Sequence, residues 1–502
     1  MNRTALRRRM VLGTAATFAG NGWAMVVSLV TLPILLRGLG PEQFGLWALI
    51  QTLSAVTGWA SLIHFGPGTA VTRAVAATDG VEDREARGRA IGSGLVMLAG
   101  CALLAAALVA VVGPIAMPHL FSTGAGLTGT LREAVLIFAV QTLADAMTES
   151  IESCLEGMQR VDISRAVDGA RRTAVAALVC PAALTHQGLV GVATASCVGS
   201  YIGLGVGASA MAIVARRQQL AVSRAAIREL LRDSRSIALL KPLGVAERAM
   251  DRTVVGLLLG PTTVAVVEVA TQVANGAASV LSASAYSVVP ASSWLSTRED
   301  APGLRALLNR GTRFSVGVTL PVVAIVMIIA APALRVWVGS DAAYGPTLVA
   351  LSTIALAAPV AVGGELLIGI GRASLVLRAT VAALAVNLVA TVTLVHAIGI
   401  VGTFLGTVVA EIVFVPLLCR AFLPQVGESA PQFVRGALMP ALPPLLALGS
   451  VGLAASRLPF GDAAVAALAG AAGLAAYAAT LLVTRGRDGR GVAAVRRLVG
   501  ER

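Results

Sequence analysis

Long apolar segments separated by short polar connections dominate this chain of 502 residues. About fourteen of them reach the roughly 20 residues that a membrane-spanning helix needs. They cover residues 11–36, 44–64, 90–112, 131–155, 170–186, 188–215, 237–259, 262–289, 314–332, 345–370, 374–398, 401–421, 437–455 and 463–484. The pattern therefore predicts an all-α polytopic membrane protein.

The longest polar connection, Arg216–Ser236, divides the spans into six before it and eight after it. In this connection Ile227, Leu230 and Leu231 alternate with arginines at helical spacing, which predicts an amphipathic helix on the cytoplasmic surface. We expect an N-terminal six-helix lobe at 1–215, a linker at 216–236, a C-terminal six-helix lobe at 237–421, two additional helices at 422–484 and a basic tail at 485–502.

Similar dipeptides recur in the two halves. Gly40-Pro41 and Gly260-Pro261 follow the first and seventh spans at an offset of 220 residues. Gly113-Pro114 and Ala331-Pro332 end the third and ninth spans at an offset of 218 residues. Two six-helix bundles in the same orientation, related by an axis along the membrane normal, produce such a repeat. The repeat predicts that the two lobes are pseudo-symmetric.

Basic residues are distributed unevenly between the connections. Thirty-three of the 39 Lys and Arg residues lie on one side of the spans, and only Arg37, Arg132, Arg335 and Arg457 lie on the other. The positive-inside rule then predicts a multi-pass protein of the inner (plasma) membrane with both termini in the cytoplasm. The net charge of +13 is spread over short loops, where it serves topology and anionic lipid headgroups rather than nucleic acid.

Composition also limits the chemistry. A mean hydropathy of +0.82 with 13% charged residues is far from that of a soluble domain. No spacing of Cys and His suits a metal site, and no Walker A motif is present. No connection on the outer side is long enough for a catalytic loop, so we expect neither an enzyme nor a bound cofactor.

Ionisable residues inside spans are functional candidates because a charge in hydrocarbon costs about 2.5–3.5 kcal/mol on insertion scales. Asp145, Glu149, Glu152 and Glu156 follow an i, i+4, i+7, i+11 pattern with Gln141 one turn earlier, which puts them on one helix face. We expect Glu152 and Glu156 to be hydrated and to pair with Arg160, Arg171 or Arg172. For Asp145 and Glu149 two roles remain open, lining a transport cavity as coupling acids or forming a structural ion pair.

The seventh span carries Arg248 and Arg252 on one face, together with Lys241 near its start. Arginine binds phosphate with two parallel hydrogen bonds, so this face suits a diphosphate. Asp251 would hold Arg248 through an i, i+3 pair. The alternative is that the charges of this span only neutralise one another.

Single acids occur at Glu268, Glu365 and Glu411 in otherwise apolar spans, where each would pair with an arginine or carry a coupling ion. Glu365 ranks first, because Gly363-Gly364 before it predicts a locally opened helix. Arg73 follows Gly66-Pro67-Gly68, which predicts a break from which it would reach the cavity. The alternative for Arg73 is one more topology-setting arginine.

The segment Arg37-Gly38-Leu39-Gly40-Pro41-Glu42-Gln43-Phe44-Gly45-Leu46-Trp47 resembles the signature opening of bacterial polysaccharide-transporter flippases, members of the multidrug/oligosaccharidyl-lipid/polysaccharide (MOP) exporter superfamily. His64-Phe65-Gly66-Pro67-Gly68 followed by Arg73 is similar to the turn of that family after its second span, with His64 where the pattern has an aspartate. Asp251-Arg252 before Leu259-Gly260-Pro261 also matches. The resemblance implies two six-helix lobes around a central cavity and transport by alternating access.

We therefore expect a flippase that translocates a polyprenyl-diphosphate-linked oligosaccharide across the inner membrane for surface polysaccharide biosynthesis. The diphosphate-binding candidates are Arg248, Arg252 and Arg73, and the coupling or cavity acids are Asp145, Glu149, Asp251 and Glu365. Expected partners are the bilayer, the lipid-linked oligosaccharide and the polysaccharide polymerase machinery, with H⁺ or Na⁺ as the coupling ion. The alternative is a cation-coupled multidrug exporter of the same superfamily, which the acids of the fourth span favour.

Overall fold

A computed structural model describes residues 3–54, 58–78, 84–121, 126–216, 218–238, 241–285, 287–459 and 461–487. Every regular element among them is a helix. The chain forms two compact units, residues 1–268 and residues 269–502, which are described separately.

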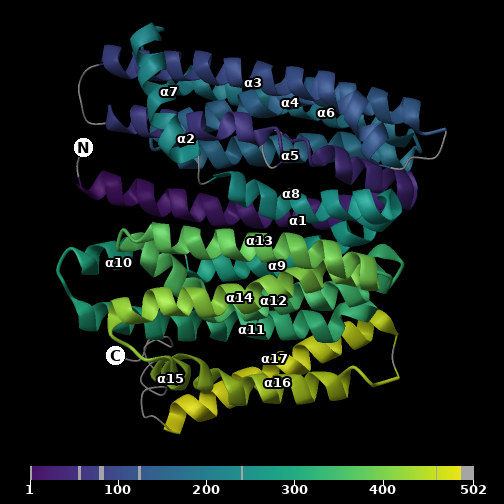
Figure 1. The fold of residues 1–502 in the computed structure, drawn as a ribbon, viewed down its shortest axis with the longest axis vertical. Coiled ribbons are helices and arrows are strands. Elements are labelled where there is room, and N and C mark those ends of the chain that lie inside the picture. Colours follow the sequence, from purple (N-terminus) through teal and green to yellow (C-terminus); the bar gives the residue numbers. More distant parts are fainter. Residues whose placement is uncertain are drawn as a thin grey trace. The chain divides into compact units, whose positions relative to one another are not determined.

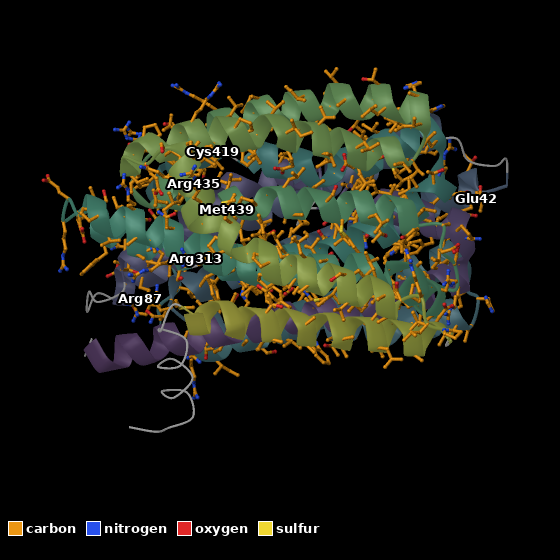
Figure 2. The ribbon with its side chains drawn as sticks, turned by 90° about the horizontal axis from the view of Figure 1, so that it is seen from below. Glu42, Arg87, Arg313, Cys419, Arg435 and Met439 are labelled. Carbon is orange, nitrogen blue, oxygen red and sulfur yellow. The ribbon has the colours of Figure 1, made fainter. Side chains whose placement is uncertain are left out.

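The first unit holds eight helices and the beginning of a ninth (Figure 1). They are α1 (Arg3–Gln51), α2 (Ser61–Ala77), α3 (Arg84–Leu120), α4 (Thr128–Gly157), α5 (Val161–Leu184), α6 (Gly188–Val214), α7 (Arg224–Ala238), α8 (Lys241–Leu259) and α9 (Pro261–Ala285). Glu42 and Arg87 lie at opposite ends of these helices (Figure 2).

The second unit begins inside α9. Its further α-helices are α10 (Val288–Ser296), α11 (Ala301–Val338), α12 (Tyr344–Gly369), α13 (Ala373–Ile398), α14 (Val401–Phe422), α15 (Ala430–Phe433), α16 (Leu442–Ala455) and α17 (Asp462–Arg487). Short 3-10 and π turns at Leu423–Val426, Val434–Leu438 and Met439–Ala441 connect α14, α15 and α16. The greater part of the predicted basic tail, residues 488–502, lies outside the described residues.

Eleven helical segments of the described chain are long and apolar enough to cross a membrane, which confirms the polytopic all-α fold. The number fourteen stays a prediction, because three of the helices that correspond to predicted spans fall short of these limits. The helix α2 has 17 residues, and α5 and α8 each carry five charged residues.

The two predicted Gly-Pro junctions are real turning points of the chain. Gly40 has φ 74° and Gly260 has φ 83°, a left-handed conformation that glycine adopts without the strain of a Cβ atom. The continuous span expected at 44–64 is wrong, since α1 ends at Gln51 and the Trp59 amide donates to the Thr52 carbonyl before α2 begins. The break expected at Gly66-Pro67-Gly68 is also wrong, because α2 runs through it.

The third and ninth predicted spans both continue past their expected ends. Pro114 lies inside α3, which reaches Leu120, and Pro332 lies inside α11, which reaches Val338. Membrane helices tolerate proline because neighbouring helices and side chains satisfy the freed backbone groups. Because α3 and α11 both extend past their predicted ends, the two helices still correspond to each other in the repeat.

Equivalent helices pack in equivalent ways within each unit. In the first, α3 packs on α4, α5 on α6 and α4 on α6, and in the second α11 packs on α12, α13 on α14 and α12 on α14. Glycines permit the closest contacts. A Cβ atom on Gly199 of α6 would lie 2.6 Å from Val175 Cα of α5, and one on Gly406 of α14 would lie 2.7 Å from Thr391 Cα of α13. Small residues on α6 and on α14 thus allow close helix packing in both units.

The predicted amphipathic helix forms as α7, but its apolar side is not free. Leu230 is 4% exposed in a core that includes Val71 of α2 and Ile91 of α3, and Ile227 packs against the same core. Leu231, predicted on the same side, is 46% exposed. The apolar face of α7 therefore docks on the protein.

Candidate functional site

The acids of α4 face a hydrophilic cavity of about 380 Å³ inside the first unit. Residues of α2, α4 and α5 line it: Gly68, Thr69, Thr72, Asp145, Glu149, Ser150, Glu152, Ser153, Glu156, Arg165, Asp168, Arg171 and Arg172. Eight of these side chains are ionisable. The predicted acidic stripe of α4 is thus confirmed as one wall of a cavity.

A chain of ion pairs joins α4 to α5 along this wall. Arg171 donates from Nη1 to Asp145 Oδ1 at 3.1 Å and from Nη2 to Asp168 Oδ1 at 3.0 Å. Arg172 donates from Nε to Asp168 Oδ2 at 2.8 Å. The Gln141 amide donates to the other oxygen of Asp145 at 3.1 Å. Asp145 therefore lines this cavity and is also ion-paired. Its role as a coupling acid stays a prediction.

Local spacing explains why α5 completes the network. Asp168, Arg171 and Arg172 stand at i, i+3 and i+4, so they share one face of α5. Gly203 of α6 makes room behind Arg171, since a Cβ atom there would lie 2.5 Å from Arg171 Cγ. Asp168 was not among the predicted residues, and Arg171 was expected to pair with Glu152 or Glu156. The i, i+3, i+4 spacing within α5 was the available signal.

The cytoplasmic end of the stripe has a separate pair. Glu156 accepts from Arg165 Nη2 and from the Ser164 hydroxyl, both at 3.2 Å. The expected partner Arg160 instead binds Asp162 through two hydrogen bonds of 3.1 Å. Glu152 Oε1 is buried without a hydrogen-bond donor among the described residues. The expected pairing of Glu156 with an arginine is confirmed with a different arginine, and the expected hydration of Glu152 stays a prediction.

Charge in this cavity is unbalanced. Five carboxylates face three guanidinium groups, and each of these arginines is already bound to a carboxylate. The surplus of negative charge favours a cation or a group rich in hydroxyl donors over a free anion.

The charges of the seventh predicted span are arranged differently from the expectation. Arg252 of α8 forms an ion pair with Glu268 of α9, in which Nη2 donates to Oε1 at 3.0 Å and Nε lies 2.7 Å from Oε2 without hydrogen-bond geometry. Glu268 was expected either to pair with an arginine or to carry a coupling ion. The structure shows the arginine pair. The side chains of Arg248 and Lys241 lie outside the described residues. Asp251 is partly buried one residue before Arg252.

Two further candidates lie apart from the cavity. Arg73 is exposed on α2 and does not line it, although its neighbours Thr69 and Thr72 do. Glu365 is partly buried in the second unit. The opened helix expected beside Glu365 is wrong, because α12 is continuous and a Cβ atom on Gly363 would lie 2.3 Å from the Phe422 ring. These glycines serve close packing on α14.

Among the described residues, no group of His, Cys, Asp and Glu is arranged to hold a metal ion.

Comparison with solved structures identifies the fold. The chain superposes on the lipid II flippase MurJ in an inward closed conformation with a TM-score of 0.72 and 13% identity, covering 96% of this chain and 100% of that one. A multidrug resistance MATE family transporter of the MOP superfamily in an inward-facing conformation gives 0.67 and 17%, covering 80% and 94%. A MOP superfamily transporter from Pyrococcus furiosus with a binding pocket of reversed polarity gives 0.51 and 15%, covering 84% and 94%.

No curated protein sequence matches the chain. The family model described as polysaccharide biosynthesis protein matches residues 10–296, more than half of the chain. With the fold of MOP transporters and this match, the chain belongs to the polysaccharide biosynthesis protein family.

Proposed function

We propose that this protein is a flippase that moves a polyprenyl-diphosphate-linked oligosaccharide across the inner membrane by alternating access. Its product would feed surface polysaccharide biosynthesis, next to the polysaccharide polymerase machinery. Membership of a polysaccharide biosynthesis family and the MOP fold support this proposal. Both termini would lie in the cytoplasm, as the distribution of arginines predicts.

The observation that carries the proposal is the charged cavity among α2, α4 and α5. A sugar-bearing headgroup has to cross about 30 Å of hydrocarbon, and it needs hydrogen-bonding partners on the way. Carboxylates accept hydrogen bonds from sugar hydroxyls, and arginines donate to sugar oxygens. A cavity lined by eight ionisable side chains supplies both kinds of partner.

The diphosphate needs cationic partners, for which Arg252, Arg248 and Arg73 are the candidates. Both carboxylate oxygens of Glu268 face the guanidinium group of Arg252, as two oxygens of a phosphate group would. Glu268 would therefore hold Arg252 in place and release it when a phosphate arrives. While no substrate is bound, the pair with Glu268 keeps the charge of Arg252 from being unpaired in the membrane.

Transport against a gradient needs a coupling ion, H⁺ or Na⁺. Asp145, Glu149, Asp251 and Glu365 are the acids proposed to carry it. The surplus of carboxylates in the cavity supports Glu149 and Asp145 first.

The test measures the lipid-linked oligosaccharide in cells deleted for this gene, with extraction and labelling of inner-leaflet lipid. We expect accumulation that the wild-type gene reverses and Arg252→Ala does not. Arg372→Ala is the matched control, because Arg372 is an exposed arginine at the start of α13 and should restore flipping fully. Protein level in the membrane is measured for each variant, and full flipping by Arg252→Ala at wild-type level would remove Arg252 from the proposal.

A cation-coupled multidrug exporter is the second candidate, and the surplus of carboxylates in the cavity is what favours it. An exporter predicts no accumulation of lipid-linked oligosaccharide in the deleted cells, together with increased sensitivity to cationic drugs. Loss of that resistance in Glu149→Gln would then identify the cavity as the drug site.

A further inference from the structure

The helix α7 presents two different faces. Ile227, Leu230 and Ser234 face the core shared with α2 and α3 or are buried beside it. Arg224, Arg228 and Arg232 are exposed at i, i+4 and i+8, which makes them one stripe on the opposite side. Glu229 is the only acid among the described exposed residues of this helix.

The segment before α7 fixes the helix to α3. The Ser223 amide donates to Ser93 Oγ at 2.9 Å, and the Ala221 amide donates to the Gly88 carbonyl at 3.4 Å. A Cβ atom on Gly88 would lie 1.9 Å from the Gln219 carbonyl oxygen, so only glycine admits this crossing. The helix α7 is therefore held against the lobe independently of any other partner.

Exposed apolar side chains accompany the arginine stripe. Leu220 and Val222 of the preceding segment are 53% and 58% exposed, and Leu231 of α7 is 46% exposed. The helix runs across the direction of α3 and α4, near the end of the unit at which α1 begins (Figure 1). A helix lying across spanning helices is parallel to the membrane plane, where arginines reach phosphates and leucines enter the acyl boundary.

We propose that this face of α7 binds the anionic phospholipid headgroups of the adjoining leaflet through Arg224, Arg228 and Arg232, with Leu220, Val222 and Leu231 in the acyl boundary. Opposite charge and the mixture of arginines with exposed aliphatic side chains select a lipid surface over a soluble anion.

Lipid binding at α7 reaches the transport cavity through α2. The core side of α7 packs on α2, and Thr72 of α2 donates to the Ser153 carbonyl of α4 at 3.0 Å. Gly68 and Thr72 line the cavity. The lipid-binding face of α7 is therefore joined to the cavity wall through α2.

The test is native mass spectrometry of the full-length protein released from bilayers of equal parts phosphatidylglycerol and phosphatidylcholine. Wild type should retain phosphatidylglycerol preferentially. With about 1 kcal/mol for each arginine near an anionic surface, Arg224→Gln/Arg228→Gln/Arg232→Gln should weaken this retention about a hundredfold. The triple lysine variant should keep most of it, because the charge remains.

Two controls separate the site from general charge. Arg372→Gln/Arg378→Gln removes exposed arginines from α13 and should leave retention at the wild-type level. Leu220→Ser/Val222→Ser should weaken retention without changing charge. Equal retention by the triple glutamine variant and wild type, or equal loss in the α13 control, would overturn the proposal. None of these measurements depends on which substrate is transported, so they fail or succeed separately from the proposed function.

Discussion

The pair α4 and α5 in the first unit and the pair α12 and α13 in the second occupy equivalent places in their bundles, yet their interiors differ. The cavity between α4 and α5 is lined with acids and arginines. The helix α12 has Glu365 as its one Asp, Glu, Lys or Arg residue and packs through Val362, Leu366 and Leu367 into an apolar core. Arg378, on α13, is exposed.

Different residues determine the helix packing and the chemistry of the interior. Glycines at the interfaces of α6 with α5 and of α14 with α13 bring backbones together in both units. Among the described residues, ion pairs join α4 to α5 in the first unit, whereas α12 carries the single acid Glu365 in the second. The repeat therefore specifies the scaffold, and the charged residues of α4 and α5 make the interior of one copy hydrophilic.

The largest effect should follow from Arg171→Ala. The side chains of Arg171 and Asp145 are 16% and 8% exposed, so removing the arginine leaves the Asp145 charge buried without its partner. Breaking such a pair costs about 3–5 kcal/mol. We expect a large fall in the thermal unfolding temperature of the purified protein, and loss of transport.

Arg378→Ala is the matched change in the second unit and should cost less than about 0.5 kcal/mol, as most exposed substitutions do. The double variant Asp145→Asn/Arg171→Gln, which removes both charges, should recover part of the stability that Arg171→Ala loses. If Arg171→Ala and Arg378→Ala lower the free energy of unfolding equally, the ion pairs of the first interior do not stabilise the protein.

A smaller loss is expected for Gly203→Ala. The new Cβ atom would lie 2.5 Å from Arg171 Cγ and 2.9 Å from its Cα, so Arg171 has to move away from Asp145. Overpacking of this kind costs about 1–3 kcal/mol. Gly205→Ala in the same helix has nothing within 4 Å of the new atom and should be neutral or slightly stabilising, because alanine favours helix. The thermal unfolding temperatures of Gly203→Ala and Gly205→Ala, measured under the same conditions, test this difference.

Much of the fold could be predicted because its signals are periodic. Hydrophobic length located nearly every helix, and the Gly40-Pro41 and Gly260-Pro261 repeat located two junctions that the structure confirms. Helix ends inside apolar sequence could not be predicted at Pro114 and Pro332, since bundle neighbours decide whether a membrane helix survives a proline.

The site was only half predictable. The stripe of α4 follows from helical spacing on one segment, whereas the partner of each acid depends on which turn of α5 lies opposite. Nothing in one sequence fixes that register, so Glu156 was given the wrong arginine. Asp168, by contrast, was recognisable from its i, i+3 and i+4 spacing to Arg171 and Arg172. The breaks expected beside Gly363 and Gly66 failed because glycine in these helices serves packing or simply remains helical.

Glu152→Gln should act in the opposite direction to the two losses above. Its Oε1 atom is buried without a hydrogen-bond donor in the described part of the chain, so a neutral amide of the same shape avoids a desolvation cost. We expect the protein to become more stable by about 1–2 kcal/mol in thermal unfolding. Glu365→Gln is the matched change in the apolar unit. A destabilised Glu152→Gln protein would mean that this carboxylate is bound to a partner and contributes to the lobe.

The smallest effect concerns a second difference between the units, which lies on the outside of the bundles. The helix α3 leaves Leu104, Val111 and Ile115 exposed, whereas its equivalent α11 is covered by α16 and α17. Tyr477 of α17 donates its hydroxyl to the Gly317 carbonyl of α11 at 2.6 Å. Tyr477→Phe keeps the ring and removes this one hydrogen bond, so it should cost about 1 kcal/mol.

Hydrogen exchange of the α17 backbone amides measures this loss where it occurs, and α3 serves as the internal reference because it belongs to the first unit. Faster exchange confined to α17 would mean that the additional helices are held to α11 by a small number of specific contacts. An unchanged α17 would mean that apolar packing between α11, α16 and α17 suffices. The added pair would then be an extension of the same small-residue packing that builds both lobes, with Gly452 and Gly470 lying against Ile328 and Ile325.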